Sequence, residues 1–418
     1  MSKQNQSYVG PLIIIGLLFF TFGFITWTNG TLIPYLTIVC DLKTETEAFF
    51  VTSAFYMAYF FLALPASAIL QKIGFKRGMV LGLVVVALGT LIFIPAASSR
   101  TYSYFLTGLF VQGMGLALLQ TAVNPYVSIL GPIESAARRI SMMGIANKFA
   151  GILAPIIMGA IVLKGASDLE KRLAGSSTQA VKNEILAEMA SRVETPYLFL
   201  AAYLLVVAVI IWFSNLPEVQ EEEEVADLNQ RKNSVFGFPN LVLGVVAIIC
   251  YVGAEVIAGD GIGQYGKNIG ISLDDAKNFT AYTLAAMLVG YIIGVIAIPK
   301  YLKQEIALKY SAILGLILTV AAIMTSGYVS VYSIALMGLA NALMWPALFP
   351  LSIRGLGRFT KIGSALLIMG IGPGGGLLPL LYAELGGSTN PQRGFWVMAA
   401  CYIYILYYAI FGYKKRSW

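Results

Sequence analysis

Long apolar segments separated by short polar ones make up most of this chain. Each apolar segment has about 20 residues, enough for an α-helix to cross the hydrocarbon core of a bilayer. They lack the alternation of apolar and polar residues typical of an outer-membrane barrel. The pattern predicts twelve membrane-spanning helices, at about residues 11–38, 48–70, 78–97, 103–130, 141–163, 197–214, 239–262, 277–299, 305–325, 330–352, 362–384 and 394–413.

Two longer polar segments interrupt the pattern. Residues 165–196 are expected to contain a short surface helix. Residues 215–237 include a row of glutamates at 221–224, and such a charge run predicts a solvated linker. We therefore expect an N-terminal six-helix bundle over 1–214, a charged cytoplasmic linker over 215–237 and a C-terminal six-helix bundle over 238–418.

Composition supports an all-α integral membrane protein. Hydrophobic residues make up 58% of the chain and charged residues 12%, whereas soluble domains carry about 25% charged residues. The net charge of +7 comes from basic residues at predicted helix ends, so it does not indicate nucleic-acid binding. The absence of histidine excludes histidine relays, triads and metal sites. The cysteines, Cys40, Cys250 and Cys401, lack metal-ligand spacing, so we expect no metal or cofactor.

The distribution of Lys and Arg predicts the orientation. The predicted loops on the side of the N-terminus carry more of them than the opposite loops, which by the positive-inside rule places both termini in the cytoplasm. The first apolar run has no small-residue cleavage site, so it is interpreted as a retained first helix.

Two carboxylates, Glu255 and Asp260, fall in the predicted seventh helix. An ionised acid in lipid costs at least a few kcal/mol, so such residues usually face a water-filled cavity and carry function. Four glycines between 253 and 263 predict a bent or locally unwound helix. The alternative for Asp260 is a place at the helix end, in interfacial water.

Several predicted helices carry amides. Gln120 and Asn124 lie four residues apart and share a helix face, where donors and acceptors suit sugar hydroxyls. Asn29 in the first helix either faces a cavity or bonds to a neighbouring helix. Asn341 and Trp345 in the tenth helix suit a sugar ring, with core packing as the alternative for Trp345.

Lys148 lies about two turns from the cytoplasmic end of the fifth helix. Its side chain either extends to the membrane surface or pairs with Glu255 or Asp260. A pair that opens when a cation or proton binds would couple ion movement to transport.

Five segments together resemble the fucose:proton symporter family of the major facilitator superfamily. They are TNGTLIPY (28–35), SAFYMAYFFLALPASAILQKIGFKRG (53–78), LLQTAVNPYVSILGP (118–132), CYVGAE (250–255) and WPALFPLSIRGLG (345–357). The motifs TNG, LLQTA and GAEVIAGD are more similar to the glucose/galactose and N-acetylglucosamine branch of this family. The resemblance implies two parallel, pseudo-symmetric six-helix bundles that alternately expose a central site.

The resemblance also identifies departures from the family. The acids of the fucose symporter in helices 1 and 4 fall on Gly30 and Gln120, so its proton-carrying pair is missing. The helix 5 asparagine falls on Asn147, the helix 10 aromatic on Trp345 and the helix 7 glutamine on Glu255. The carboxylate function is therefore expected on helix 7, with Na+ or H+ as the coupling ion.

We expect a transporter, not an enzyme, that imports a neutral glucose- or galactose-type hexose or N-acetylglucosamine with a cation across a bacterial inner membrane. The alternatives are a fucose or other sugar facilitator or proton symporter, and an exporter of small molecules. The chain is expected to be a monomer in the bilayer. The expected sugar-binding residues are Asn29, Gln120, Asn124, Asn147, Glu255, Gln264, Asn341 and Trp345, and the expected ion-coupling residues are Glu255, Asp260 and Lys148.

Overall fold

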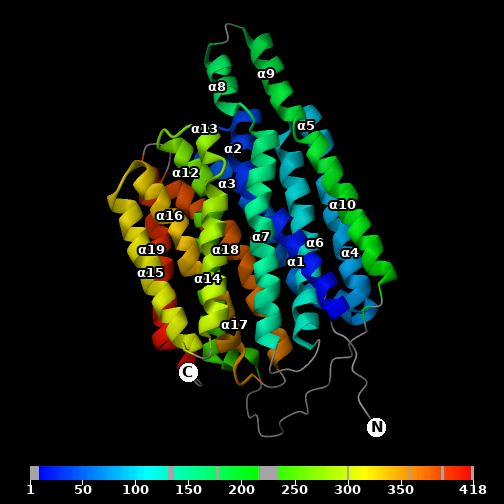
Figure 1. Ribbon diagram of the computed structural model, residues 1–418, viewed down its shortest axis with the longest axis vertical. Coiled ribbons are helices and arrows are strands. Elements are labelled where there is room, and N and C mark those ends of the chain that lie inside the picture. Colours follow the sequence, from blue (N-terminus) through cyan, green and yellow to red (C-terminus); the bar gives the residue numbers. More distant parts are fainter. Residues whose placement is uncertain are drawn as a thin grey trace.

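The computed structural model is a bundle of long helices (Figure 1). It describes residues 9–129, 136–175, 178–214, 216, 234–298, 301–356, 359–386 and 390–415. Among these residues, twelve helical segments are long and apolar enough to cross a membrane, as the sequence predicts. The described residues contain helices and connecting turns but no strand, so the all-α expectation is confirmed.

The first six spans and their connections come from ten helices. They are α1 (Val9–Trp27), α2 (Asn29–Val39), α3 (Glu45–Ile73), α4 (Phe75–Leu91), α5 (Phe93–Ser99), α6 (Tyr102–Ile129), α7 (Ala136–Val162), α8 (Ala166–Gly175), α9 (Gln179–Ser191) and α10 (Glu194–Phe213).

The last six spans follow in the same way. They comprise η2 (Val235–Gly237), α11 (Pro239–Gly259), α12 (Ile262–Asn268), α13 (Leu273–Ala276), α14 (Phe279–Ala297), α15 (Gln304–Met324), α16 (Gly327–Asn341), α17 (Met344–Ile353), α18 (Thr360–Gly386), η4 (Pro391–Phe395), α19 (Trp396–Ile410) and η5 (Gly412–Lys414). Most of the expected linker, residues 217–233, lies outside the described residues.

Four of the spans are interrupted. The break between α11 and α12 at Asp260 and Gly261 confirms the interruption predicted for the seventh helix. There the Gly261 N–H donates to Val256 rather than to Ile257, so the regular helical bonding shifts by one residue. The breaks between α1 and α2, α4 and α5, and α16 and α17 correct the unbroken helices expected at 11–38, 78–97 and 330–352.

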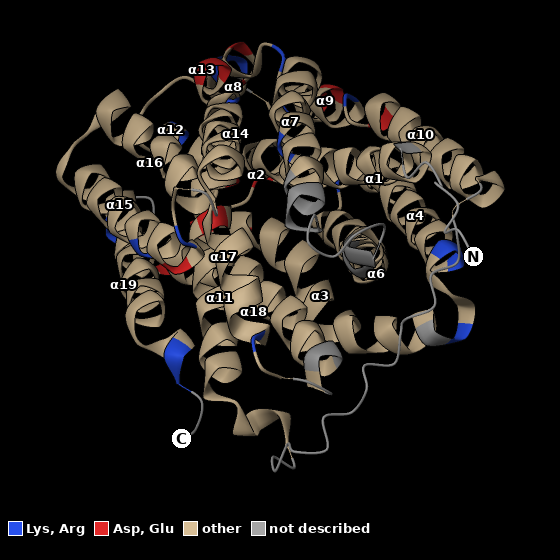
Figure 2. Ribbon diagram, turned by 60° about the horizontal axis from the view of Figure 1, so that its bottom comes forward, with Lys and Arg blue, Asp and Glu red and all other residues tan. Residues whose placement is uncertain are grey.

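The two ends of the bundle differ. Helix α1 begins and α19 ends at the same end, which we call the terminal end (Figure 1). The paired helices α8 and α9 project from the opposite end, which we call the hairpin end. Figure 2 shows that the helix bodies are almost free of charge and that charged residues gather near the two ends. This distribution is the one expected of helices that cross a bilayer.

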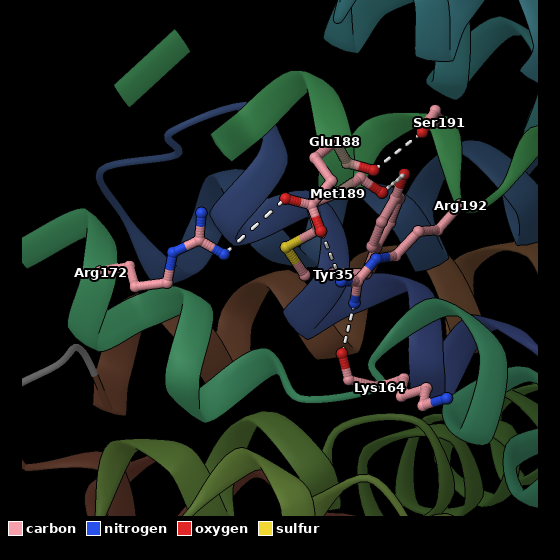
Figure 3. Close-up of polar contacts among 7 residues, drawn as sticks. All are labelled: Tyr35, Lys164, Arg172, Glu188, Met189, Ser191 and Arg192. Atoms are coloured by element: carbon pink, nitrogen blue, oxygen red, sulfur yellow. Dashed lines mark hydrogen bonds and ion pairs between the residues drawn. The ribbon is translucent and has the colours of Figure 1, made fainter. Parts of the chain in front are cut away.

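The α8–α9 hairpin replaces the single surface helix expected within 165–196. Tyr35 in α2 donates to the carbonyls of Ala190 at 2.9 Å and of Met189 at 3.3 Å, which fastens α9 to the first span; Figure 3 shows Tyr35 beside Met189. Glu188 accepts from Arg192 at 3.1 Å and lies 3.8 Å from Arg172 in α8. The Arg172–Glu188 pair therefore links the two hairpin helices, whereas the pair with Arg192 lies within the end of α9.

Close backbone contact sets the packing of α1 on α7. A Cβ atom added at Gly23 would lie 1.9 Å from the carbonyl oxygen of Asn147. At Gly16, two turns earlier on α1, an added Cβ would find only the Met143 side chain, at 3.9 Å. Of these two glycines, only Gly23 therefore depends on lacking a side chain.

We predict that Gly23→Ala destabilises the protein and that Gly16→Ala does not. Forcing extra atoms into a packed contact costs about 1–3 kcal/mol, and more where backbone must move. Thermal unfolding of the purified protein in detergent should give a lower Tm for Gly23→Ala alone. Equal Tm values for the two variants would contradict this close packing of α1 on α7.

Candidate functional site

An ion pair lies in the interior where the two halves of the chain meet. The Lys148 ammonium in α7 is 2.9 Å from Glu255 Oε1 in α11, and the two side chains are only 9% and 12% exposed. The same ammonium lies 4.4 Å from the ring centre of Trp27 in α1, a cation–π arrangement. Of the alternatives left open for Lys148, the structure has the pair with Glu255 and not extension to the surface.

Asp260 is buried about one and a half turns beyond Glu255, at the break between α11 and α12. Its side chain is fully inaccessible, which is inconsistent with a place in interfacial water. The carboxylate faces the backbone amide of Gly30 and the Tyr56 hydroxyl, but neither oxygen reaches hydrogen-bond geometry with a described partner.

Gly30, where the resemblance led us to expect a departure from the family, has no room for a side chain. An added Cβ would lie 2.4 Å from Thr280 Oγ1. The Thr280 hydroxyl donates to the Gly259 carbonyl and so fixes α14 against the end of α11. The carboxylate beside Gly30 therefore comes from Asp260, across the contact between the halves.

Aromatic residues extend the polar group toward α6 and α17. Gln120 Nε2 donates to the Tyr59 hydroxyl at 2.8 Å, and the rings of Tyr59 and Tyr56 stack with centroids 6.3 Å apart. Tyr251, one turn from Glu255, has its ring centre 6.3 Å from that of Trp345, which is half-buried. Contacts thus link Gln120, Asp260, Glu255 and Trp345 to one interior region, which we call the central polar group.

Sequence reasoning missed the tyrosines of this group. Tyr56 and Tyr59 are three residues apart and share a face of α3, and that spacing was the available signal. Tyrosine is common in this chain, with 23 copies, so type and spacing alone did not separate these two from packing residues.

The remaining expected sugar-binding amides lie elsewhere or serve packing. Asn147 donates to the Phe19 carbonyl at 3.2 Å, which joins α7 to α1. Asn341 accepts from Tyr402 in α19 at 2.9 Å, within the C-terminal half. Gln264 donates to Glu45 at 3.1 Å, at the hairpin end.

Two further amides cannot be assigned to the site from the described contacts. Asn29, beside Gly30, is 1% exposed, and its Nδ2 has no partner among the described residues. Asn124 belongs to α6, but its side chain lies outside what the structure describes. The structure therefore adds neither to the central polar group.

Contacts close the two halves together at the hairpin end. Lys267 in α12 is 2.7 Å from Glu170 in α8, and the Thr46 hydroxyl donates to Glu384 at 2.8 Å. Deeper in the bundle, the Ser53 hydroxyl donates to the Gly376 carbonyl between α3 and α18. The central polar group is thus separated from the hairpin end by a layer of polar contacts.

A pocket of about 790 Å³ lies away from this group, beside the hairpin. It is lined by Lys164, Arg172, Arg192 and exposed apolar residues such as Phe199. Its two arginines are engaged in holding the hairpin, since Arg192 donates to the Lys164 carbonyl and to Glu188 and Arg172 pairs with the same glutamate (Figure 3). The central polar group, placed between the two halves, is the better candidate site.

The architecture and the site define a membrane carrier. Within the described residues, no three His, Cys, Asp or Glu side chains form a metal-binding cluster, and the three cysteines are free thiols. A buried ion pair, a second buried acid and hydrogen-bonding aromatics lie instead between two helical halves. Such an arrangement suits a polar solute held at membrane depth.

Comparison with known proteins identifies the family. Residues 15–379 match the model of the Major Facilitator Superfamily. The chain is 35% identical to a glucose/galactose transporter of Brucella abortus over 99% of this chain and 97% of that protein. It is 28% identical to the L-fucose-proton symporter of Escherichia coli, over 98% and 94%.

A solved structure agrees with these relatives. The fucose:proton symporter of E. coli superposes with a TM-score of 0.72 and 26% identity, covering 97% of this chain and 99% of that one. The chain belongs to the Major Facilitator Superfamily and is a transporter, not an enzyme. The fold of two pseudo-symmetric six-helix bundles is confirmed, and so is the resemblance to the glucose/galactose and fucose transporters.

We predict that the Lys148–Glu255 pair stabilises the fold only as a pair. Removing one partner leaves a bare buried charge, which costs about 3–5 kcal/mol. Lys148→Met and Glu255→Gln alone should each lower the Tm in detergent. The double variant has no bare charge from this pair, so its Tm should exceed that of either single variant. If the two losses simply add, the two charges do not interact.

Proposed function

We propose that the protein imports a neutral monosaccharide by cation-coupled symport. The cargo is a glucose- or galactose-type hexose or N-acetylglucosamine, carried across a bacterial inner membrane by alternating access. In this proposal both termini are cytoplasmic and the hairpin end faces outward. The names and full-length coverage of the relatives support the sugar, and the observation that carries the coupling is the buried Lys148–Glu255 pair between the halves.

Sugar binding is proposed near the central polar group. Gln120 and Glu255 offer hydrogen-bonding groups, and Trp345 offers an aromatic surface for the C–H face of a pyranose ring. The contacts of Gln120 with Tyr59 and of Trp345 with Tyr251 favour these positions. The wider proposed set keeps Asn29, Asn124, Asn147, Gln264 and Asn341, whose groups would have to become available in another conformation.

Coupling is proposed through the charges. While Lys148 and Glu255 pair across the contact between α7 and α11, the two halves are held together. A cation or proton bound at the carboxylates would change the charge balance around that pair and, with it, the relation between the halves. With a membrane potential of about 100 mV, one entering cation supplies about 2.3 kcal/mol, which sustains about a 50-fold sugar gradient.

The transport experiment uses the purified protein in proteoliposomes. Uptake of labelled glucose is measured under a sodium gradient and, separately, under a proton gradient. Unlabelled galactose, fucose and N-acetylglucosamine serve as competitors. We predict accumulation above the external concentration with one of the two gradients, and competition by galactose.

Substitutions test the role of the pair in the same assay. Lys148→Ala and Glu255→Gln should each abolish accumulation, because each leaves one half of the buried pair unbalanced. Lys309→Ala and Glu184→Gln change exposed residues of the same types and should leave it intact. Equal accumulation by the pair variants and by these controls would end the coupling proposal. Uptake that only equilibrates, with or without a gradient, would identify a facilitator.

A further inference from the structure

Two helix breaks face each other beside Asp260. Directly after the break between α1 and α2, Asn29 and Thr31 flank Gly30 in the first turn of α2, and each has a buried polar side-chain atom without a described partner. The break between α11 and α12 presents the Asp260 carboxylate to the Gly30 amide. Each break belongs to a different half of the chain, so the carboxylate lies at the contact between the halves.

The charges around this carboxylate do not balance. The groups that face it are Glu255 from α11, Lys148 from α7, the Tyr56 hydroxyl from α3 and the Gly30 backbone from α2. Lys148 provides one positive charge and lies 2.9 Å from Glu255. With both acids ionised, the buried group therefore carries one negative charge in excess, located at Asp260.

A bare carboxylate is costly at this depth. Asp260 is fully buried and has no described hydrogen-bond partner for either oxygen. Burying an ion without compensation costs several kcal/mol, so the closed hairpin end is compatible with a neutralised Asp260. When the halves separate there, water reaches the carboxylate and removes the penalty for its charge.

We infer that Asp260 is the group that takes up the co-transported monovalent cation, Na+ or H+, and that its neutralisation allows the halves to close at the hairpin end. The inference rests on the symport proposed above and assigns its cation to one residue. Glu255 is the weaker candidate because its charge is already compensated by Lys148.

The neighbouring groups suit this role. The Tyr56 hydroxyl, which faces the carboxylate, is a neutral oxygen of the kind that can complete a Na+ site. A proton needs no further ligand, and the nearby Tyr56 hydroxyl can then accept a hydrogen bond from the acid. Either cation removes the same excess charge, so experiment has to distinguish them.

The test compares Asp260→Asn with the unaltered protein in proteoliposomes and in detergent. The amide is neutral at all times, so exchange of labelled for unlabelled glucose across equilibrated vesicles should persist, whereas gradient-driven accumulation should be lost. In detergent, the Tm of the unaltered protein should rise with NaCl relative to choline chloride, or with lower pH in choline chloride. Asp260→Asn should lose that response, and the exposed Asp168→Asn should keep it.

The outcomes separate this inference from the proposed function. If the unaltered protein exchanges no glucose, the proposed function fails, whereas the Tm response still tests Asp260. If Asp260→Asn accumulates sugar, loses exchange while folded, or keeps the cation response of its Tm, the inference is wrong. A response to NaCl at fixed pH identifies Na+, and a response to pH alone identifies H+.

A second measurement applies if Asp260→Asn does not fold. The unaltered protein is treated with a hydrophobic carbodiimide, which modifies protonated carboxyl groups inside membranes, and the modified peptide is mapped. Protection of Asp260 by NaCl, or modification that increases as the pH falls, supports the inference. Absence of modification at Asp260, or modification that neither condition changes, overturns it.

Discussion

The interior of this protein is organised by the need to compensate charge away from water. Lys148 and Glu255 come from opposite halves, and neither can leave the other without exposing a bare charge to a medium of low polarity. The contact between the two halves therefore depends on the charges of these two side chains. Trp27 covers the ammonium, so the first span also belongs to this arrangement.

The helix breaks also help to compensate charge in the interior. An unbroken helix satisfies its own backbone and offers nothing to a partner, whereas a break supplies amides and carbonyls at membrane depth. At the α11–α12 break the carbonyls of Ala258 and Gly259 accept from Thr283 and Thr280 of α14. The break is thus held open by neighbouring side chains, which leaves Asp260 directed toward the other half.

The membrane spans could be predicted from the sequence because each depends only on its own run of residues. A run of about 20 apolar residues has only one stable arrangement in a bilayer, whatever its neighbours are. The sequence was also sufficient to predict the seventh-helix break, where glycines surround Asp260. The break after Trp27 has no comparable cluster, and the choice of Glu255 over Asp260 as the partner of Lys148 depends on how α7 packs against α11. Such contacts between helices cannot be predicted from any single segment of the sequence.

The amides in the membrane helices have different roles that the sequence does not distinguish. Gln120, Asn147 and Asn341 look alike in the sequence, each an amide in an apolar helix. In the structure, Gln120 bonds to a tyrosine of the central polar group, Asn147 ties α7 to α1, and Asn341 is held by α19. An amide used for packing within one half moves with that half and cannot respond to the other. Residues that sense the relative position of the halves must face both, as the buried charged groups of Lys148, Glu255 and Asp260 do.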